Sequence, residues 1–308
     1  MDMVALAVIV IGLIVALQIV HVYFFRKQKE PKPCPKIPVA FPRTNALLRW
    51  YNVKHVNAIV DQFKSVQEVG EALQAAGLGA CHLMFGVDFS ASNAYQGERT
   101  FDGQNLHTIE DELENPYQRV IRILGQTLEQ LDTDGIIPAF GFGDASTKAK
   151  TVFPFKPEGY CCGYKDVLDA YCQIIPHIEL SGPTSFAPLI HRAVHIVCST
   201  RKFHVLVIIV DGQATMEKET CSAIVTASKC PLSIVLVGVG DGPWQSMETF
   251  HKQLPHRQFD NFRFVDFNRV ITYGAQAETT FAVHALLDVL DQYNAVKGLG
   301  LLNHRLTL

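Results

Sequence analysis

Residues 81 to 92 read CHLMFGVDFSAS, and this stretch decides the fold. Its first seven residues are almost continuously apolar, and an oxygen-bearing turn, Asp88-Phe-Ser-Ala-Ser92, follows at once. A short apolar run that ends in a turn is typical of a strand covered on both faces, as parallel strands are. We therefore predict a buried strand from Cys81 to Val87 with polar side chains at its carboxyl end.

The same pattern recurs outward along the chain, with amphipathic helices between the apolar runs. The other predicted strands are Ile136–Phe142, His204–Val210, Leu232–Val239 and Phe262–Val265. The predicted helices are Phe63–Leu78, Pro116–Leu131, Lys165–Ile175, Pro188–Ser199, Lys218–Ser228, Trp244–Gln253 and Ala277–Tyr293. This alternation predicts an α/β fold, a doubly wound and mostly parallel sheet with helices on both faces.

Composition limits the kinds of partner. The chain has 308 residues, which suits one core with short appendages. Its formal charge is -3, from 27 basic and 30 acidic residues, and no long basic run follows the first forty positions. We therefore expect no nucleic-acid partner. Several of the eight cysteines lie inside apolar runs, which indicates the reduced thiols of a cytosolic domain.

The first 25 residues predict a transmembrane helix ahead of the sheet. From Val4 to Phe25 only Gln18 and His21 interrupt the apolar run, which is long enough to cross about 30 Å of hydrocarbon. Basic residues follow the run, so the positive-inside rule predicts a single-pass membrane protein with its C-terminal domain in the cytosol. A cleaved signal peptide is the alternative, but it needs a basic start and a shorter apolar stretch.

Four segments follow from these patterns. Residues 1–25 form the predicted anchor, and residues 26–58 form a Pro/Lys-rich juxtamembrane stalk in which prolines alternate with lysines. Such a composition favours an extended, semi-rigid chain. Residues 59–294 form the predicted folded domain, and residues 295–308 form a C-terminal tail.

Three oxygen-bearing turns fall where an open α/β sheet binds ligands, outside the carboxyl ends of its central strands. They carry Asp88-x-Ser90-x-Ser92, Thr184 in the loop before the Pro188 helix, and Asp211 after the strand His204–Val210. Ligands that are all oxygens suit Mg²⁺ or Mn²⁺, and the absence of Cys and His among them argues against Zn²⁺. The first turn alone could instead cap the helix that follows it.

Such a metal site predicts protein binding rather than catalysis. Magnesium often keeps waters, so a site with few protein carboxylates leaves a position that a partner's Asp or Glu can fill. The sequence offers no nucleotide loop, activated nucleophile or general-base pair, so we expect no enzyme activity. The polar insertion from Ala94 to Glu114 follows the first turn, and we hypothesise that it selects the partner.

Two further motifs predict ordinary structure. Gly238-Val-Gly240-Asp-Gly242 lacks the third glycine of a dinucleotide-binding turn, which favours a tight strand-to-helix turn. His191 and His195 have the spacing of zinc ligands on a helix, but Arg192 stands where the catalytic Glu of such a motif would be. Packing or surface histidines are the favoured interpretation.

The chain resembles the copine-type von Willebrand A domain over about residues 60 to 290. Asp88-x-Ser90-x-Ser92, Thr184 and Asp211 are similar to its metal-ion-dependent adhesion site. The segments that carry the resemblance are Gly86–Asn93, Asn115–Tyr117, Ala139–Asp144, Gly182–Pro188, Leu232–Trp244 and Phe259–Phe262. They are similar both to copines and to the plant RING-domain ubiquitin ligases of the same subfamily.

The resemblance implies that these five residues are metal ligands, with Ser90, Ser92 and Thr184 direct and the carboxylates partly through water. It implies Mg²⁺ or Mn²⁺ as cofactor, with Ca²⁺ as a further option, and cytosolic proteins that present Asp or Glu as partners. We therefore expect a membrane-anchored protein-binding adaptor. The alternative is a ubiquitin-ligase-related protein without its own RING finger, because the 308 residues contain no Cys-x-x-Cys pair.

Overall fold

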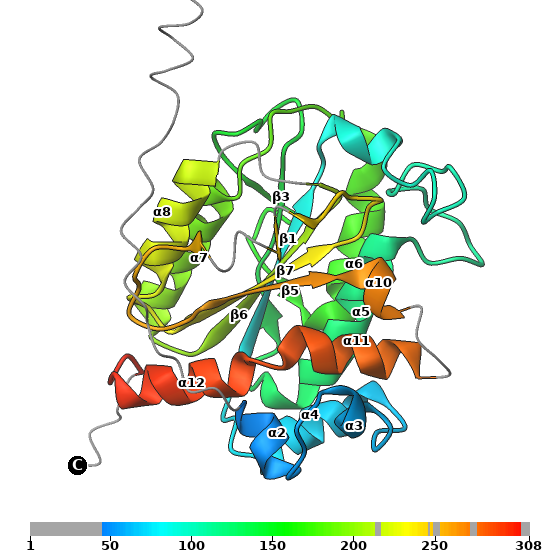
Figure 1. Cartoon of the computed structure of the whole chain (residues 1–308). Helices are drawn as coiled ribbons and strands as arrows, with labels where there is room; N and C mark the ends of the chain where they lie inside the picture. Colours follow the sequence, from blue (N-terminus) through cyan, green and yellow to red (C-terminus); the bar gives the residue numbers. More distant parts are fainter. Residues whose placement is uncertain (1–44, 213–216, 246, 249–252, 272–275, 303–308) are drawn as a thin grey trace, which may run out of the picture. The chain divides into compact units, whose positions relative to one another are not determined.

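The computed structural model describes residues 45–212, 217–245, 247–248, 253–271 and 276–302. Their centre is a six-stranded sheet of order β4-β3-β1-β6-β7-β8 (Figure 1). The strands are β1 (His82–Asp88), β3 (Ala139–Phe142), β4 (Phe153–Pro154), β6 (His204–Val210), β7 (Leu232–Gly238) and β8 (Phe262–Asp266). All neighbours pair in parallel except β4, which is antiparallel to β3. The predicted mostly parallel sheet is confirmed.

Helices cover both faces of this sheet. Alternate residues of β1 enter two separate apolar clusters, with Leu83, Phe85 and Val87 in one and Met84 in the other. The first cluster takes side chains from α4 (Val66–Ala75), α5 (Pro116–Leu128), α6 (Gly163–Ile174), α10 (Phe267–Ile271), α11 (Ala277–Leu286) and α12 (Val289–Gly298). The second takes side chains from α7 (Ala187–Thr200) and α8 (Glu217–Ala227), which Figure 1 shows on the other side of the sheet.

Two predicted elements are divided in the structure. The run from Ile136 to Phe142 breaks at Pro138, which has no N–H to give to a ladder. Its first part, β2 (Ile136–Ile137), pairs antiparallel with β5 (Cys161–Cys162) outside the main sheet. The predicted helix Ala277–Tyr293 divides into α11 and α12, and at the junction the carbonyl of Leu287 accepts a hydrogen bond from the side chain of Asn45.

The fold class needs one correction, which concerns the transmembrane helix. No helix within the described ranges is long and apolar enough to cross a membrane. The longest, α7, has 14 residues, whereas a span needs about 20 in continuous helix. Residues 1–25, on which the prediction rested, lie outside the described residues. The transmembrane helix is therefore removed from the fold class, and the single-pass membrane location with a cytosolic domain falls with it.

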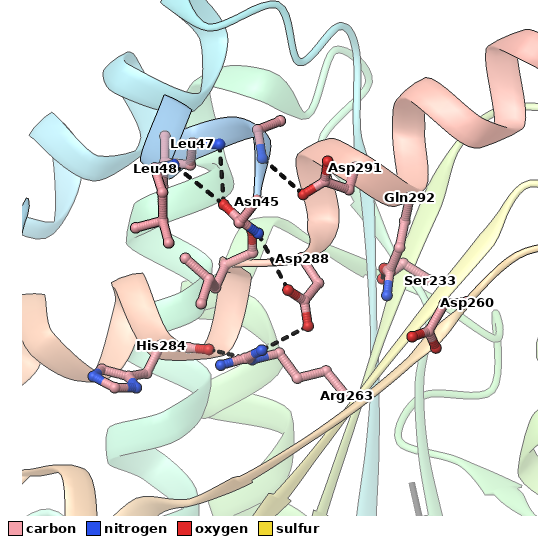
Figure 2. A network of polar contacts seen from close by, with 12 residues as sticks. Asn45, Leu47, Leu48, Ser233, Asp260, Arg263, His284, Asp288, Asp291 and Gln292 are labelled. Atoms are coloured by element: carbon pink, nitrogen blue, oxygen red, sulfur yellow. Dashed lines mark hydrogen bonds and ion pairs between the residues drawn. The ribbon is translucent and has the colours of Figure 1, made fainter. Parts of the chain in front are cut away.

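Helix α2 (Ala46–Trp50) forms part of the packed structure although it lies in the range predicted for the stalk. The Asn45 side chain accepts hydrogen bonds from the backbone N–H groups of Leu47 and Leu48, and its amide donates to Leu287 O at 2.7 Å (Figure 2). The backbone N–H of Ala46 donates to the Asp291 carboxylate of α12 at 3.0 Å. Asn45 thus caps α2 and fastens it to the α11–α12 junction.

Shorter helices complete the described fold. They are α3 (Asn57–Val60) and the single turns η1 (Ala91–Ala94), η2 (Glu129–Leu131) and η3 (Ile175–His177). Helix α12 runs to Gly298, past the predicted start of the C-terminal tail.

The dual role of Asn45 gives a stability prediction. We expect Asn45→Ala to lower the free energy of unfolding by about 1–2 kcal/mol, because it removes both the cap and the bond to Leu287. Asn45→Ser keeps a capping oxygen and should recover about half of the loss. Urea unfolding of the three proteins measures the order, and equal midpoints would show that α2 is not fastened through this side chain.

Candidate metal centre

The pairing of β1 with β6 brings two carboxylates to one edge of the sheet. The two strands run in parallel, with Val87 opposite Ile209, so that both end at the same edge. Asp88 is the last residue of β1, and Asp211 follows the last residue of β6. Both carboxylates are buried, with 1% of each residue exposed. Strand register therefore fixes their proximity.

Hydroxyl groups join this pair. Ser90 donates its backbone N–H to Asp88 Oδ1 at 2.9 Å, and its Oγ donates to Asp211 Oδ1 at 3.4 Å. Ser90 Oγ also lies 3.0 Å from Ser92 Oγ. Ser90 stands at the N-cap position of η1, but its side chain makes no capping bond. Its hydroxyl faces the carboxylates, in contrast to the capping alternative weighed from the sequence.

Thr184, the fifth predicted ligand, lies in a loop that runs beside this turn. Ser181 forms a bridge with Ser90, and the backbone N–H of Ala91 donates to Ser181 O at 2.5 Å. Thr184 follows three residues later and is 6% exposed, just before α7 begins. The structure thus brings Asp88, Ser90, Ser92 and Asp211 into one polar cluster and places the Thr184 loop alongside it.

The electrostatics of the cluster favour a bound cation. Burial, and then the neighbouring Asp211 carboxylate, raises the pKa of Asp88 well above its usual range. Burial also raises the pKa of Asp211. Within the described residues Asp211 Oδ2 has no hydrogen-bond partner although it is buried. Two adjacent buried carboxylates are costly without a counter-charge, and hard oxygen donors of this kind suit Mg²⁺ or Mn²⁺. The residues present therefore fit the predicted ion.

A neutral histidine, His107, holds the backbone of the turn that begins at Asp88. His107 Nε2 donates to the carbonyl oxygen of Asp88 at 2.9 Å, and its Nδ1 accepts from the hydroxyl of Tyr171 at 2.7 Å. Burial lowers the pKa of His107 to about 3, so the ring stays neutral. It stacks on Phe89 and Tyr117, with centroids 4.7 and 4.2 Å away. His107 therefore holds the backbone of the turn that begins at Asp88 and adds no positive charge that would repel a cation.

Asn93 completes this support. Its amide donates to the carbonyl oxygens of Asp88 and Ser90 at 3.2 and 3.0 Å, and its Oδ1 accepts from Tyr117 Oη at 2.7 Å. Sequence reasoning assigned no role to Asn93 or His107. Asn93 adjoins the Asp-x-Ser-x-Ser motif and could have been suspected, whereas His107 lies in a polar insertion where no pattern marks it.

The insertion from Ala94 to Glu114 is hydrogen-bonded to Asp241, at the rim of the candidate metal centre. The Asp241 carboxylate accepts from the backbone N–H groups of Arg99 and Thr100 at 2.9 and 3.0 Å. A Cβ on Gly240 would lie 2.3 Å from Asp211 O, so this position requires glycine. The Gly238–Gly242 motif is thus a tight turn that locks the insertion beside Asp211.

A second group of side chains lies at the other end of β1. His82, Asp132 and Asp134 place three ligand atoms within 4.8 Å of one another and could hold a metal ion. The sequence patterns did not predict this group, because its residues come from a strand start and from the turn before another strand.

Comparisons with known proteins agree with these features. The copine family model matches residues 105–305. Copine family protein 2 of Caenorhabditis elegans is 47% identical over 266 residues, which are 85% of this chain and 3% of that protein. The Arabidopsis thaliana proteins E3 ubiquitin-protein ligase RGLG4 and RGLG5 are 44% and 46% identical, over 89% and 80% of this chain and 71% and 61% of their own lengths.

The relatives differ in how much of their length is matched. The chain spans only 3% and 24% of two copine family proteins of C. elegans, but 71% of RGLG4. The residues matched by the family model include every strand of the sheet after β1. The chain belongs to the copine family.

Proposed function

We propose that this domain binds protein partners through a Mg²⁺ or Mn²⁺ ion held by Asp88, Ser90, Ser92, Thr184 and Asp211. When bound, the ion would supply a coordination position to an Asp or Glu side chain of the partner. The observation that carries the proposal is the buried Asp88–Asp211 pair, in which one oxygen of Asp211 has no hydrogen-bond partner among the described residues. A cation resolves that imbalance.

The chain's own residues then hold the site ready. Asn93 and His107 fix the carbonyl groups of the turn, so Ser90 and Ser92 keep their hydroxyls directed at the carboxylates. Burial of both carboxylates excludes bulk water, which strengthens their attraction for a cation. Tyr95, on the insertion, is 65% exposed and can contact a partner that docks at the rim.

A role in ubiquitination is the second candidate. It is supported by RGLG4 and RGLG5, whose names describe E3 ubiquitin-protein ligases and whose similarity covers most of this chain. A RING finger needs paired Cys-x-x-Cys ligands, and residues 1–308 contain no such pair. We therefore propose that, in this role, the domain would bind a substrate or a partner ligase and would not transfer ubiquitin itself.

Metal binding should be visible as stability. At a Mg²⁺ concentration of about 100 times the Kd, binding adds roughly 2.7 kcal/mol, which corresponds to about 5–10 °C in Tm for a domain of this size. Asp211→Asn should abolish the shift, because it removes a carboxylate ligand. In EDTA at neutral pH the variant should unfold at the same temperature as wild type or higher, because the repulsion with Asp88 is gone.

Scanning calorimetry with and without Mg²⁺ or Mn²⁺ measures both effects. Asp111→Asn, which changes an exposed carboxylate of the insertion, is the matched control and should keep the full shift. A Tm shift that survives in Asp211→Asn would place the ion elsewhere.

Partner capture should depend on the same residues. We expect Asp88→Ala to lose the proteins that wild type labels in a proximity-labelling experiment in cells, while the variant stays folded. The loss follows because removing a metal ligand should weaken ion binding by at least about 100-fold. Glu71→Gln, which changes an exposed carboxylate on α4, away from the insertion, serves as control. Identical labelled sets for wild type and Asp88→Ala would refute a metal-bridged mode of binding.

A ubiquitin-transfer assay tests whether the second candidate role is limited to binding or includes transfer of ubiquitin. With E1, E2, ubiquitin and ATP but no added ligase, we expect this chain to form no ubiquitin chains. Immunoblotting for ubiquitin reads the result, and a RING ligase assayed in parallel shows that the reagents work. Chain formation by this protein alone would contradict a purely binding role.

A further inference from the structure

The amino end of β1 carries a polar cluster that the proposed function does not use. His82 opens β1 and Asp88 closes it, so at about 3.3 Å per residue the two ends lie about 20 Å apart. At the His82 end, η2 ends at Leu131, and the chain then passes through Asp132 and Asp134 before β2 begins. The three side chains converge from two segments that are about 50 residues apart in sequence.

The two distances from His82 in this cluster match those between ligands of a tetrahedral ion. His82 Nδ1 lies 3.2 Å from Asp132 Oδ1 and 3.2 Å from Asp134 Oδ1. Nitrogen and oxygen ligands at about 2.0–2.1 Å from Zn²⁺ stand roughly 3.3 Å apart at a tetrahedral angle. The imidazole nitrogen therefore faces both carboxylates at a separation that one small ion between them would produce.

The buried Asp132 carboxylate is the observation that indicates a ligand. Its side chain is 6% exposed, and neither of its oxygens has a hydrogen-bond partner within the described part of the chain. A single Nδ1–H cannot bond well to two carboxylates at once, and Asp134 takes the better geometry. A buried carboxylate without hydrogen-bond donors is destabilising, because nothing offsets the loss of its hydration. A cation shared by the three groups would satisfy it.

The donor set selects the kind of cation. One imidazole nitrogen with two carboxylates suits Zn²⁺ and similar transition metals, whereas Mg²⁺ prefers oxygen ligands alone. The His204 ring packs against that of His82 at a tilt of 35°, with centroids 5.1 Å apart, and its own Nδ1 donates to Lys202 O at 2.8 Å. Asp134 is 35% exposed, so the open side of the cluster leaves room for water as a fourth ligand.

One positive charge competes for the same carboxylate. Lys202 Nζ lies 2.7 Å from Asp134 Oδ2, and its side chain is 48% exposed. This ion pair leaves Asp134 Oδ1 facing His82, but its charge opposes a second cation nearby.

We propose that His82, Asp132 and Asp134 form a second divalent-cation site, of the zinc class, separate from the oxygen-lined centre at the opposite end of β1. Bound there, the ion would tie the start of β1 to the turn between η2 and β2. The site does not depend on the proposed partner-binding function.

Cobalt and zinc titrations of the purified, metal-stripped full chain test the site. We expect one Co²⁺ to bind with the visible absorption of a tetrahedral nitrogen-and-oxygen site, and Zn²⁺ to displace it. Asp132→Asn should weaken Zn²⁺ binding by at least about 100-fold. Asp134→Asn changes a partly exposed side chain, so it tests the same loss with little risk to folding, and about tenfold weakening is expected. Lys202→Met should tighten binding by roughly fivefold, because it removes the competing charge.

Two controls assign the ion to this cluster. Asp88→Ala should bind Zn²⁺ as wild type does, since it alters only the other centre. Cys198 Sγ and Cys230 Sγ lie 2.6 Å apart and could compete for zinc, so the variant with both changed to Ser should also keep the cobalt spectrum. A thiolate absorption band lost in that variant, or equal affinities of wild type, Asp132→Asn and Asp134→Asn, would overturn the proposal.

Discussion

The placement of two carboxylates side by side in the interior is the constraint on which the rest of this structure depends. Asp88 ends and Asp211 follows a fully buried strand, and parallel pairing of β1 with β6 brings both strand ends to one edge. Neither side chain can turn to bulk water, because each residue is 99% enclosed. Like charges in such a place raise one another's pKa or attract a cation. The apolar strands that stabilise the sheet thus also bury the two carboxylates, which then favour a bound counter-ion.

The groups that surround the two carboxylates are neutral and leave the counter-charge to a bound cation. His107 sits under the Asp88 carbonyl as a neutral ring, and Asn93 and Tyr117 contribute only amide and hydroxyl groups. A positively charged residue at any of these positions would form an ion pair with the carboxylates and occupy the place of the metal. Arg99, the cation of the insertion nearest to Asp241, pairs with that carboxylate at the rim, and its side chain is 73% exposed. Positive charge is therefore kept at the edge and away from the centre.

Much of this arrangement could be predicted from the sequence, because it follows from strand ends. The Asp88 turn and Asp211 were both located by apolar runs that stop at an acidic residue, and β6 occupies the predicted residues His204–Val210. The breaks at Pro138 and at Leu287 were missed for different reasons. Pro138 lies inside an apolar run whose hydropathy does not reveal the missing N–H. The carbonyl of Leu287 accepts its hydrogen bond from Asn45, 242 residues away. No local pattern contains such a contact.

The transmembrane helix is absent from the described part of the fold, where the helices reach at most 14 residues and none is long and apolar enough to cross a membrane. Residues 1–25, whose hydropathy suggested it, lie outside the described residues. The His82 cluster escaped prediction because its ligands have no shared motif. It arises where strand order sets the start of β1 against the turn that leads into β2, and there the packing leaves the Asp132 carboxylate enclosed without a donor.

Both ends of β1 thus present the same physical situation. A polar side chain is fixed at the terminus of a strand whose seven residues are all buried, so it cannot move away from the acidic neighbours that adjoining segments supply. At the Asp88 end the neighbours are a carboxylate and hydroxyls, all hard oxygen donors. At the His82 end an imidazole nitrogen replaces the hydroxyls. Because donor hardness differs while enclosure is alike, the two ends should discriminate between magnesium-like and zinc-like ions within a single strand.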